Sequence, residues 1–343
     1  MKRKLEYNFY ITIKSFCING EEMKKLAIVI PCYNEEEVFN EISKRIIEKL
    51  NNLILRKLIS IDSFVCFIDD GSKDKTWSLI DKLSNTESKV RGIKLSNNRG
   101  HQNALVAGLV SCESHCDLTI SIDADLQDDI NAIDEMVEKF NKGFEIVYGV
   151  RKKRDTDTIF KRWTAQGFYK VMQVFGVNIV YNHADYRLTS SKVLRHFNEY
   201  REVNLFLRGI FPTIGYDSAT VEYDRNERFA GESKYPLKKM LSFAFEGITS
   251  FSTVPLKLVV FLGVLTALLT LILATWAFIQ KITGNVVPGW SSTIISIYFL
   301  GAVQLLSLGL IGQYIGKIYK EVKARPRFFI ESKLGFKDTN EPS

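Results

Sequence analysis

The pattern in this chain that most directly indicates chemistry is a pair of aspartates at the end of an apolar run. Residues 117–122 are followed by Asp123, Ala124, Asp125 and, two residues further, Gln127. Successive side chains of a strand point to opposite faces, so Asp123 and Asp125 are expected on the same side. Carboxylate oxygens suit Mg²⁺ or Mn²⁺, and Gln127 would add a neutral oxygen. The spacing predicts a divalent-metal site at Asp123, Asp125 and Gln127.

A divalent ion at this place would have a definite use. Open α/β sheets bind ligands at the carboxyl ends of their strands, and a cation there offsets the charge of a nucleotide leaving group. A second pair with the same spacing, Asp155 and Asp157, follows a basic loop instead of a strand. An aspartate-rich chain produces such pairs by chance, so the position after a strand is what favours Asp123 and Asp125.

Two long segments of the 343-residue chain carry no charge. Residues 24 to about 235 mix charged and apolar residues, whereas residues 258–280 and 282–316 contain no charged residue. Each uncharged segment covers the roughly 20 residues that a bilayer-spanning helix needs. Core helices of soluble proteins are shorter, so the sequence predicts two transmembrane helices.

Positive residues flank these two segments unevenly. The connecting loop holds only Lys281, while the outer flanks hold Lys238, Lys239, Lys257, Lys317, Lys320, Lys323, Arg325 and Arg327. The positive-inside rule then predicts a multi-pass protein of the cell membrane with its catalytic domain in the cytoplasm. The net charge of +7 comes partly from this cluster and suits an anionic leaflet. No nucleic-acid motif is present, and nucleic acid is not expected as a partner.

These shifts in composition predict five parts of the chain. The first 22 residues make a poor signal peptide because Lys14 interrupts their apolar stretch, and one hypothesis is that translation begins at Met23. The predicted parts are an N-terminal extension (1–23), a catalytic domain (24–235), an amphipathic helix at the membrane surface (236–255), two transmembrane helices (256–318) and a basic cytoplasmic tail (319–343).

The predicted catalytic domain alternates short apolar runs with helical patterns. This alternation is typical of an α/β fold with a mostly parallel sheet covered on both faces. The expected strands are residues 26–31, 64–69, 90–96, 118–123 and 145–150. The chain lacks G-x-G-x-x-G and G-x-x-x-x-G-K-[ST], which disfavours dinucleotide and P-loop chemistry.

Polar residues follow the first two expected strands, where a ligand would bind. Asn34 and Ser72 are equally typical of helix caps and of ligand contacts, and both alternatives stay open. Asp70 is a second aspartate after a buried strand. It is surplus to capping, so it is expected to accept hydrogen bonds from a ribose or base.

Four motifs in order resemble those of the GT-A glycosyltransferases of family 2: I-V-I-P-x-Y-N-E, D-D-G-S, N-x-G-H-Q-x-A-x-x-A-G-L and D-A-D-L-Q-D. The resemblance runs from about residue 24 to residue 330. Further stretches narrow it to the polyprenyl-phosphate glycosyltransferases, which include bactoprenol glucosyltransferases, undecaprenyl-phosphate N-acetylglucosaminyltransferases and the related dolichyl-phosphate mannosyltransferases. These stretches are Arg151 with residues 160–162, and residues 182–188, 204–209 and 228–235.

The resemblance implies roles for individual residues. Donor nucleotide binding is implied for Pro31, Tyr33, Asn34, Glu35, Asp69, Asp70, Asp123, Arg228 and Lys234. Arg151 and Arg162 are implied to bind the acceptor phosphate, although basic residues near a membrane also serve only to bind anionic lipid. Asp125 and Asp185 are the expected catalytic residues. For Asp185 three roles stay open: a base, a group that orients the acceptor, or a partner of Arg187. Arg99 stands where many relatives have phenylalanine, so the donor contacts of that turn stay open.

The resemblance also implies an activity. It implies inverting transfer of one hexose from UDP-glucose or UDP-N-acetylglucosamine to undecaprenyl phosphate at the inner face of the membrane, with Mg²⁺ or Mn²⁺. A phosphate monoester has its second pKa near 6, so this acceptor needs no strong base. Implied partners are a flippase and an outward-facing transferase, which would use the product on a cell-wall polymer or glycan, and a homo-oligomer stays open.

Two other functions are weighed against this one. A processive polysaccharide synthase should show Q-x-x-R-W and more spans, but Arg162-Trp163 is preceded by Ile159 where glutamine is needed. A non-catalytic membrane scaffold or lipid carrier should have lost the aspartates and basic loops, which are intact here. Both alternatives are therefore less favoured than transfer of a single sugar.

Overall fold

The computed structural model describes residues 23–152, 183–224, 249, 252–283 and 289–336. An eight-stranded sheet with the order β7-β5-β6-β4-β1-β2-β3-β8 forms the centre of the molecule. Its strands are β1 (Leu26–Cys32), β2 (Phe64–Asp69), β3 (Val90–Leu95), β4 (Leu118–Ser121), β5 (Ile146–Arg151), β6 (His183–Ser190), β7 (Ser218–Tyr223) and β8 (Ile330–Leu334).

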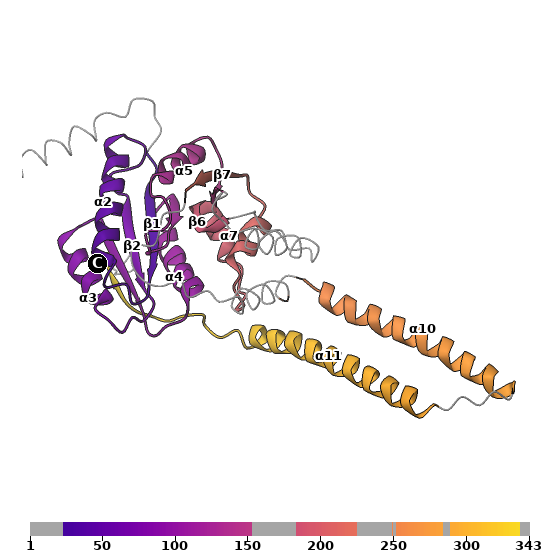
Figure 1. Cartoon of the computed structure of the whole chain (residues 1–343). Helices are drawn as coiled ribbons and strands as arrows, with labels where there is room; N and C mark the ends of the chain where they lie inside the picture. Colours follow the sequence, from indigo (N-terminus) through magenta and orange to yellow (C-terminus); the bar gives the residue numbers. More distant parts are fainter. Residues whose placement is uncertain (1–22, 153–182, 225–248, 250–251, 284–288, 337–343) are drawn as a thin grey trace, which may run out of the picture.

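Helices cover both faces of this sheet (Figure 1). One hydrophobic cluster joins the sheet to α2 (Phe39–Leu55), α3 (Thr76–Thr86) and α5 (Ala132–Asn141). A second cluster joins the other face to α4 (His101–Glu113), α7 (Ser191–Phe197) and α8 (Leu207–Thr213). Every residue of β1 and β2 is buried, which explains why these strands read as continuous apolar runs instead of alternating patterns.

The predicted α/β class with a mostly parallel sheet is confirmed. β1 pairs in parallel with β2 and β4, β2 with β3, and β5 with β7. Two differences from the expected strands concern the candidate site. β4 ends at Ser121 and not at Asp123, so the acidic pair lies just beyond the strand. β6, absent from the expected strands, lies antiparallel between β4 and β5 and carries Asp185.

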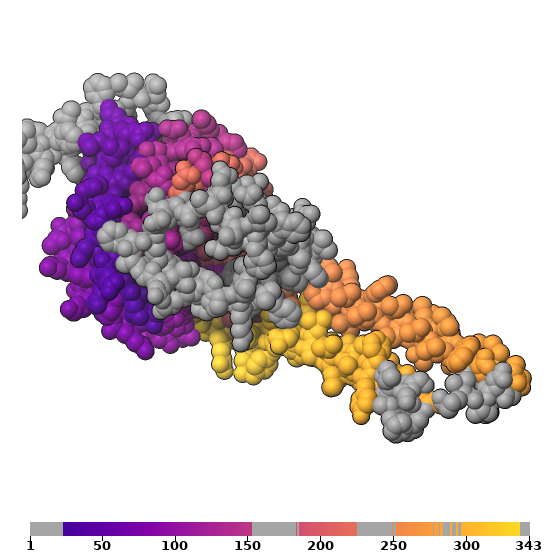
Figure 2. All heavy atoms as spheres, in the orientation of Figure 1, coloured from indigo at the N-terminus to yellow at the C-terminus, as the bar shows by residue number. Residues whose placement is uncertain are grey.

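Two long helices project from the sheet domain, α10 (Val254–Ile282) and α11 (Trp290–Lys323). Segments of both, Val254–Gln280 and Ser296–Lys323, are long and apolar enough to cross a membrane, with mean hydropathy 2.6 and 1.4. They run side by side as a narrow extension of the wider domain (Figure 2). Near their domain-proximal ends, Tyr314 donates a hydrogen bond to the carbonyl of Ser252 at 2.6 Å.

The chain after α11 adds a strand to the sheet that was not expected from the sequence. Residues 319–343 were predicted to be a basic cytoplasmic tail, but residues 330–334 return to the sheet as β8, antiparallel to β3. Ser96 donates to the carbonyl of Phe329 at 3.0 Å, and Lys94 pairs with Glu331 at 2.8 Å. Composition could not predict this, because an edge strand of five residues with alternating exposure carries little hydrophobic signal.

Several predicted features lie outside the described residues. These are residues 1–22, most of the predicted surface helix 236–255, and the side chains Arg162, Arg228 and Lys234. Their proposed roles stay predictions.

Candidate active site

The acidic turn after β4 presents its carboxylates on one side. Burial alternates along it: Asp123, Asp125 and Gln127 are partly exposed, whereas the intervening residues 124 and 126 are buried. Leu126 has a left-handed backbone (φ 58°), and the N–H of Gln127 donates to Asp125 Oδ1 at 3.1 Å. The turn therefore packs its apolar residues inward and leaves the acidic residues toward the ligand edge of the sheet.

Negative charge is concentrated at Asp123. Burial raises the pKa of Asp123, and the negative charges of Asp128, Asp185 and Asp125 raise it further. The protonated His101 lowers it, and the resulting pKa is about 6. Among the described residues no three His, Cys, Asp or Glu side chains are arranged as a complete metal cage. Magnesium sites commonly use one or two carboxylates and take further ligands from substrate phosphates. The crowded carboxylates of Asp123 and Asp125 fit such an ion, and the side-chain amide oxygen of Gln127 would be a neutral ligand.

This crowding predicts a pH dependence of metal affinity. A proton competes with the ion for Asp123, so the apparent dissociation constant for Mn²⁺ should be level above about pH 7 and rise roughly tenfold per pH unit below about 6. Titration of free Mn²⁺ by electron paramagnetic resonance between pH 5 and 8 measures this. An ordinary aspartate would keep the affinity level down to about pH 4, so a flat profile to pH 5 would contradict the prediction.

His101 begins α4 and faces two carboxylates. Its Nε2 lies 3.5 Å from Asp123 Oδ1 and 3.6 Å from Asp185 Oδ2. Desolvation opposes protonation of His101, but the hydrogen bond to Asp185 and the charges of Asp123 and Asp185 outweigh it and raise its pKa to about 9. The imidazole is thus a cation at neutral pH, and it stays 44% exposed and open to a ligand.

The position of α4 explains how His101 reaches the acidic turn. A Cβ on Gly108 would lie 2.5 Å from Cγ1 of Val29 and 2.6 Å from Cδ1 of Ile68. Only glycine lets α4 approach the sheet this closely. The helix therefore lies against β1 and β2, with its first residue at the carboxyl edge.

Asp185 on β6 is held between two cations. Arg208 Nε and Nη2 lie 3.5 and 3.4 Å from its two oxygens, and His101 lies on its other side. Burial would raise the pKa of Asp185, but Arg208 and His101 outweigh it and hold that pKa far below the ordinary value. A carboxylate held in its ionised form is a poor base. This arrangement favours a positioning role for Asp185 over general-base catalysis.

One alternative role for Asp185 was a direct pair with Arg187, and the two side chains do not form this pair. The Arg187 guanidinium is buried over the ring of Phe211, 3.5 Å from its centroid. Its three nitrogens form no hydrogen bond. Burial lowers its pKa to about 10, although the charge of Asp185 opposes this. Arg187 thus acts on Asp185 as a nearby charge and not as a direct partner.

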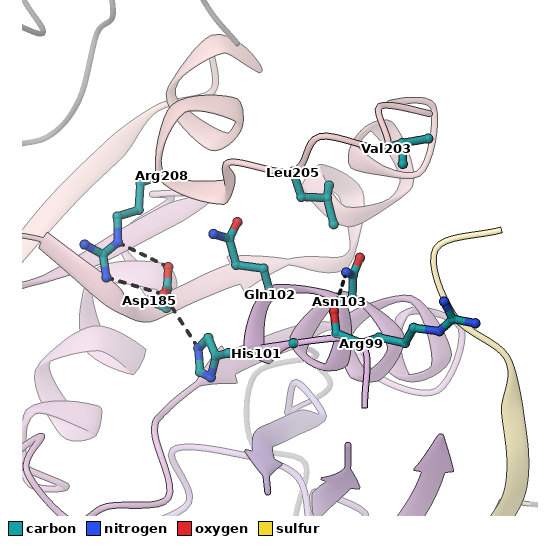
Figure 3. Close-up of a pocket in the computed structure, with 9 residues that line it drawn as sticks. Arg99, His101, Gln102, Asn103, Asp185, Val203, Leu205 and Arg208 are labelled. Atoms are coloured by element: carbon teal, nitrogen blue, oxygen red, sulfur yellow. Dashed lines mark hydrogen bonds and ion pairs between the residues drawn. The ribbon is translucent and has the colours of Figure 1, made fainter. Parts of the chain in front are cut away.

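His101, Asp185 and Arg208 form one end of a cavity of about 390 Å³ (Figure 3). Their side chains point toward one another, whereas Arg99 points toward the chain that follows α11. The far wall is formed by Val203 and Leu205. The cavity is thus polar and cationic at the end next to Asp123. Its size suits a small ligand or a headgroup.

The turns after β1 and β2 brace each other. Asn34 donates its N–H to Ser72 Oγ at 3.0 Å, and Asn34 Oδ1 accepts the N–H of Lys73 at 2.9 Å. Neither side chain caps its own helix, so the cap alternative is replaced by a cross-link between two loops. Tyr33, 41% exposed, and Glu35 follow Pro31 at the same edge, whereas Pro31 itself is buried in β1.

Asp69 and Asp70 also have structural roles. Asp70 was expected to be surplus to capping, but its carboxylate accepts the N–H groups of Arg99 and Gly100 at 2.7 and 2.9 Å. Asp69 is buried and accepts the N–H of Ser72 at 3.3 Å. Asp70 therefore fixes the turn that leads into α4, and any contact with a nucleotide would come in addition.

Arg151 ends β5 beside the acidic turn. Its Nε donates to the hydroxyl of Tyr223 at 3.2 Å, and its Nη2 lies 3.5 Å from Asp128 Oδ1. The Tyr223 hydroxyl donates to the same Asp128 oxygen at 2.6 Å. This network holds the guanidinium beside Asp128, the residue that follows Gln127 in the chain, which is compatible with the predicted contact to an acceptor phosphate.

Two residues at the centre of the site, His101 and Arg208, were not predicted as site residues. Both lie within stretches that carry the family resemblance, N-x-G-H-Q and residues 204–209. A polar residue directly after a turn glycine was the available signal for His101. For Arg208 the sequence around it does not show the ion pair, because Arg208 lies on α8 and its partner Asp185 lies on β6.

Comparison with known proteins agrees with this architecture. Residues 27–197 match Glycosyl transferase family 2. The uncharacterized glycosyltransferase YkoT of Bacillus subtilis (strain 168) is 54% identical over 90% of this chain and 92% of that protein. A bactoprenol glucosyl transferase of Shigella phage SfX is 39% identical, over 90% of this chain and 99% of that protein. A prophage bactoprenol glucosyl transferase homolog of Escherichia coli (strain K12) is 38% identical, over 90% and 98%.

Proposed function

This chain belongs to glycosyl transferase family 2, with the GT-A arrangement of sheet and helices, and we propose that it transfers one hexose from a UDP-sugar to polyprenyl phosphate. The observation that carries the proposal is the meeting of an acidic turn, Asp123 and Asp125, with a cationic cavity formed by His101 and Arg208. An acidic turn suits a metal-bound diphosphate, and a cationic cavity suits a second, phosphorylated substrate.

The relatives support the acceptor and the sugar. Proteins named as bactoprenol glucosyl transferases align with 90% of this chain and with 97–99% of their own length. This alignment is too long to cover the sheet domain alone, so it favours a polyprenyl acceptor over a soluble one. Their names favour glucose as the sugar. UDP as the nucleotide rests on the family resemblance, and UDP-N-acetylglucosamine is the alternative donor to test.

The proposed chemistry requires little proton transfer. The acceptor phosphate is largely a dianion at neutral pH, so the task of the protein is to hold one oxygen in line with the anomeric carbon. Asp185 keeps Arg208 and His101 at the cavity end nearest Asp123. Direct attack by the phosphate oxygen forms the new C–O bond as the bond to the diphosphate breaks, and the anomeric centre is inverted.

A bound divalent ion would neutralise charge on the departing diphosphate. Asp123 and Asp125, with Gln127, would hold that ion. We propose Pro31, Tyr33, Asn34, Glu35, Asp69, Asp70, Arg228 and Lys234 for the nucleotide, and Arg151 and Arg162 for the acceptor phosphate.

The two apolar helices indicate where the reaction takes place. Helices of this length and composition, together with relatives that act on bactoprenol, indicate membrane association. We propose that α10 and α11 both span the bilayer and that the sheet domain faces the cytoplasm, as the positive flanks predict. A flippase and an outward-facing transferase are the proposed users of the product.

The proposal is tested with purified full-length protein, labelled UDP-glucose or UDP-N-acetylglucosamine, and a short polyprenyl phosphate. We expect one hexose per lipid, dependence on Mg²⁺ or Mn²⁺, and loss of product in a chelator. The matched control is the corresponding polyprenol without phosphate, which should not be glycosylated. A polymer would indicate a processive synthase, and absence of any product with both donors would contradict the proposal.

A further inference from the structure

The last turn of the second membrane helix is bonded directly to the sheet domain. Glu321 Oε2 accepts the N–H of Val203 at 2.8 Å, and its Oε1 accepts the N–H and the side-chain amide of Asn204 at 2.8 and 2.7 Å. One carboxylate thus satisfies three donors on a segment that lies 117–118 residues earlier in the chain. Bonds to a charged acceptor are stronger than neutral ones, so this contact orders the segment.

The segment that Glu321 holds is a wall of the candidate site. Val203 and Leu205 line the cavity, and three residues further Arg208 pairs with Asp185. The same segment is attached on its other side, where the N–H of Leu207 donates to Gln102 Oε1 on α4 at 3.1 Å. Figure 3 shows Gln102 pointing toward this wall. The wall is therefore held between α4 and α11.

A separate connection attaches α11 to the sheet. Arg327 donates to the carbonyl of Tyr200, and β8 pairs with β3. In Figure 1 the chain after α11 runs back along the domain to the sheet. Loss of the Glu321 bonds would therefore leave the helix attached. A change in activity after loss of the Glu321 bonds would therefore result from a shift of the wall and not from detachment of α11 from the domain.

The place of Glu321 along α11 indicates which substrate meets this wall. The helix carries no charged residue before Lys317, and Glu321 lies among Lys317, Lys320 and Lys323. Lysines directly after an apolar span lie at the level of lipid headgroups. Glu321 therefore holds the wall, and Arg208 behind it, at the depth where a lipid phosphate emerges.

We propose that Glu321 is a positioning residue through which α11 aligns the 203–208 wall for the lipid-phosphate acceptor. The inference rests on the proposed function, because it assumes a lipid-phosphate acceptor. It assigns to a membrane helix a part in forming the acceptor side of the cavity. The donor side, at the acidic turn after β4, receives none of the three hydrogen bonds to Glu321.

The test separates acceptor use from donor use. Glu321→Gln keeps one acceptor oxygen but turns an amide toward an N–H donor. We expect it to lower kcat/KM for polyprenyl phosphate by about tenfold. The KM for the nucleotide sugar and the slow release of UDP without lipid should stay within about twofold. Asn204→Ala removes only the side-chain bond and should cost less, and its effect should not add to that of Glu321→Gln.

Glu331→Gln is the matched control. Glu331 lies on the same C-terminal segment as Glu321, pairs with Lys94 of β3 and does not line the cavity. It should leave both substrates within about twofold of wild type. An equal loss of donor hydrolysis in Glu321→Gln, or unchanged lipid kinetics, would overturn the inference alone. Wild-type protein that hydrolyses the donor but never modifies the lipid would overturn the proposed function, and this inference with it.

Discussion

Replacing both Asp123 and Asp125 by asparagine should lower transfer of sugar to lipid by about a thousandfold or more. Asparagine keeps the size of each side chain and the acceptor that receives the N–H of Gln127. It removes the two negative charges that would hold the metal and, through it, the diphosphate. The loss should appear in kcat and should not be recovered by raising Mg²⁺ or Mn²⁺ to tens of millimolar.

Replacement of Asp123 by asparagine should not lower the thermal stability of the protein, although it lowers activity. Folding raises the pKa of Asp123 from 3.8 to about 6. Its contribution is thus favourable below the unfolded value and is lost as pH rises through about 6. At neutral pH the metal-free Asp123→Asn variant should melt at the same temperature as wild type or higher. Loss of activity together with a clear drop in melting temperature would instead indicate a misfolded turn.

Glu135→Gln is a suitable control for both measurements. Glu135 lies on α5 after the acidic turn and pairs with Lys139 on the same helix at 2.9 Å, with its side chain about half exposed. Its neutralisation removes one acidic charge from the helix that follows the acidic turn and leaves the turn itself unchanged. Activity should stay within about twofold, because an exposed pair contributes little.

Replacing Arg208 by alanine should lower transfer by about a hundredfold and also destabilise the protein. The change leaves Asp185, only 11% exposed, without one of its two cations. Removal of one partner of a buried ion pair costs about 3 kcal/mol, because the remaining charge stays buried. The free energy of unfolding in urea and the kinetics with lipid acceptor measure the two effects separately.

The double variant Arg208→Ala, Asp185→Asn separates charge burial from function. It removes both charges, so it should recover most of the lost stability while activity stays low. Arg195→Ala on α7 is the control, since this arginine is 67% exposed and lies 3.5 Å from Glu113. Recovery of activity in the double variant would show that the pair serves folding alone and that Arg208 does not act on substrate.

The pH dependence of stability follows from the same pair. The pKa of Asp185 is held below its ordinary value by Arg208 and His101. Its contribution to stability is therefore present above the unfolded value and is lost as pH falls below it. The Arg208→Ala variant should lose less stability than wild type between pH 5 and pH 3.

Local patterns in the chain were sufficient for much of the framework. The apolar runs of β1 and β2, the acidic turn after β4 and the two long apolar helices each lie within one continuous segment. The spacing of apolar residues and the position of charges can be read from a short stretch of sequence, so these features need no knowledge of distant segments. The same property explains why Asp123 and Asp125 could be singled out without knowledge of their neighbours.

Local sequence patterns could not predict the contacts between segments that are distant in the chain. Asp70 receives the amides of Arg99 and Gly100, Arg208 meets Asp185, and Glu321 reaches Val203 and Asn204 across 117–118 residues. These partners depend on the order of strands in the sheet, including β6 between β4 and β5 and β8 beside β3. Strand order results from packing of the whole chain, and no window of sequence encodes which strand becomes the neighbour of another. The chemical groups of the site were therefore visible in the sequence, whereas their pairing arose from the fold.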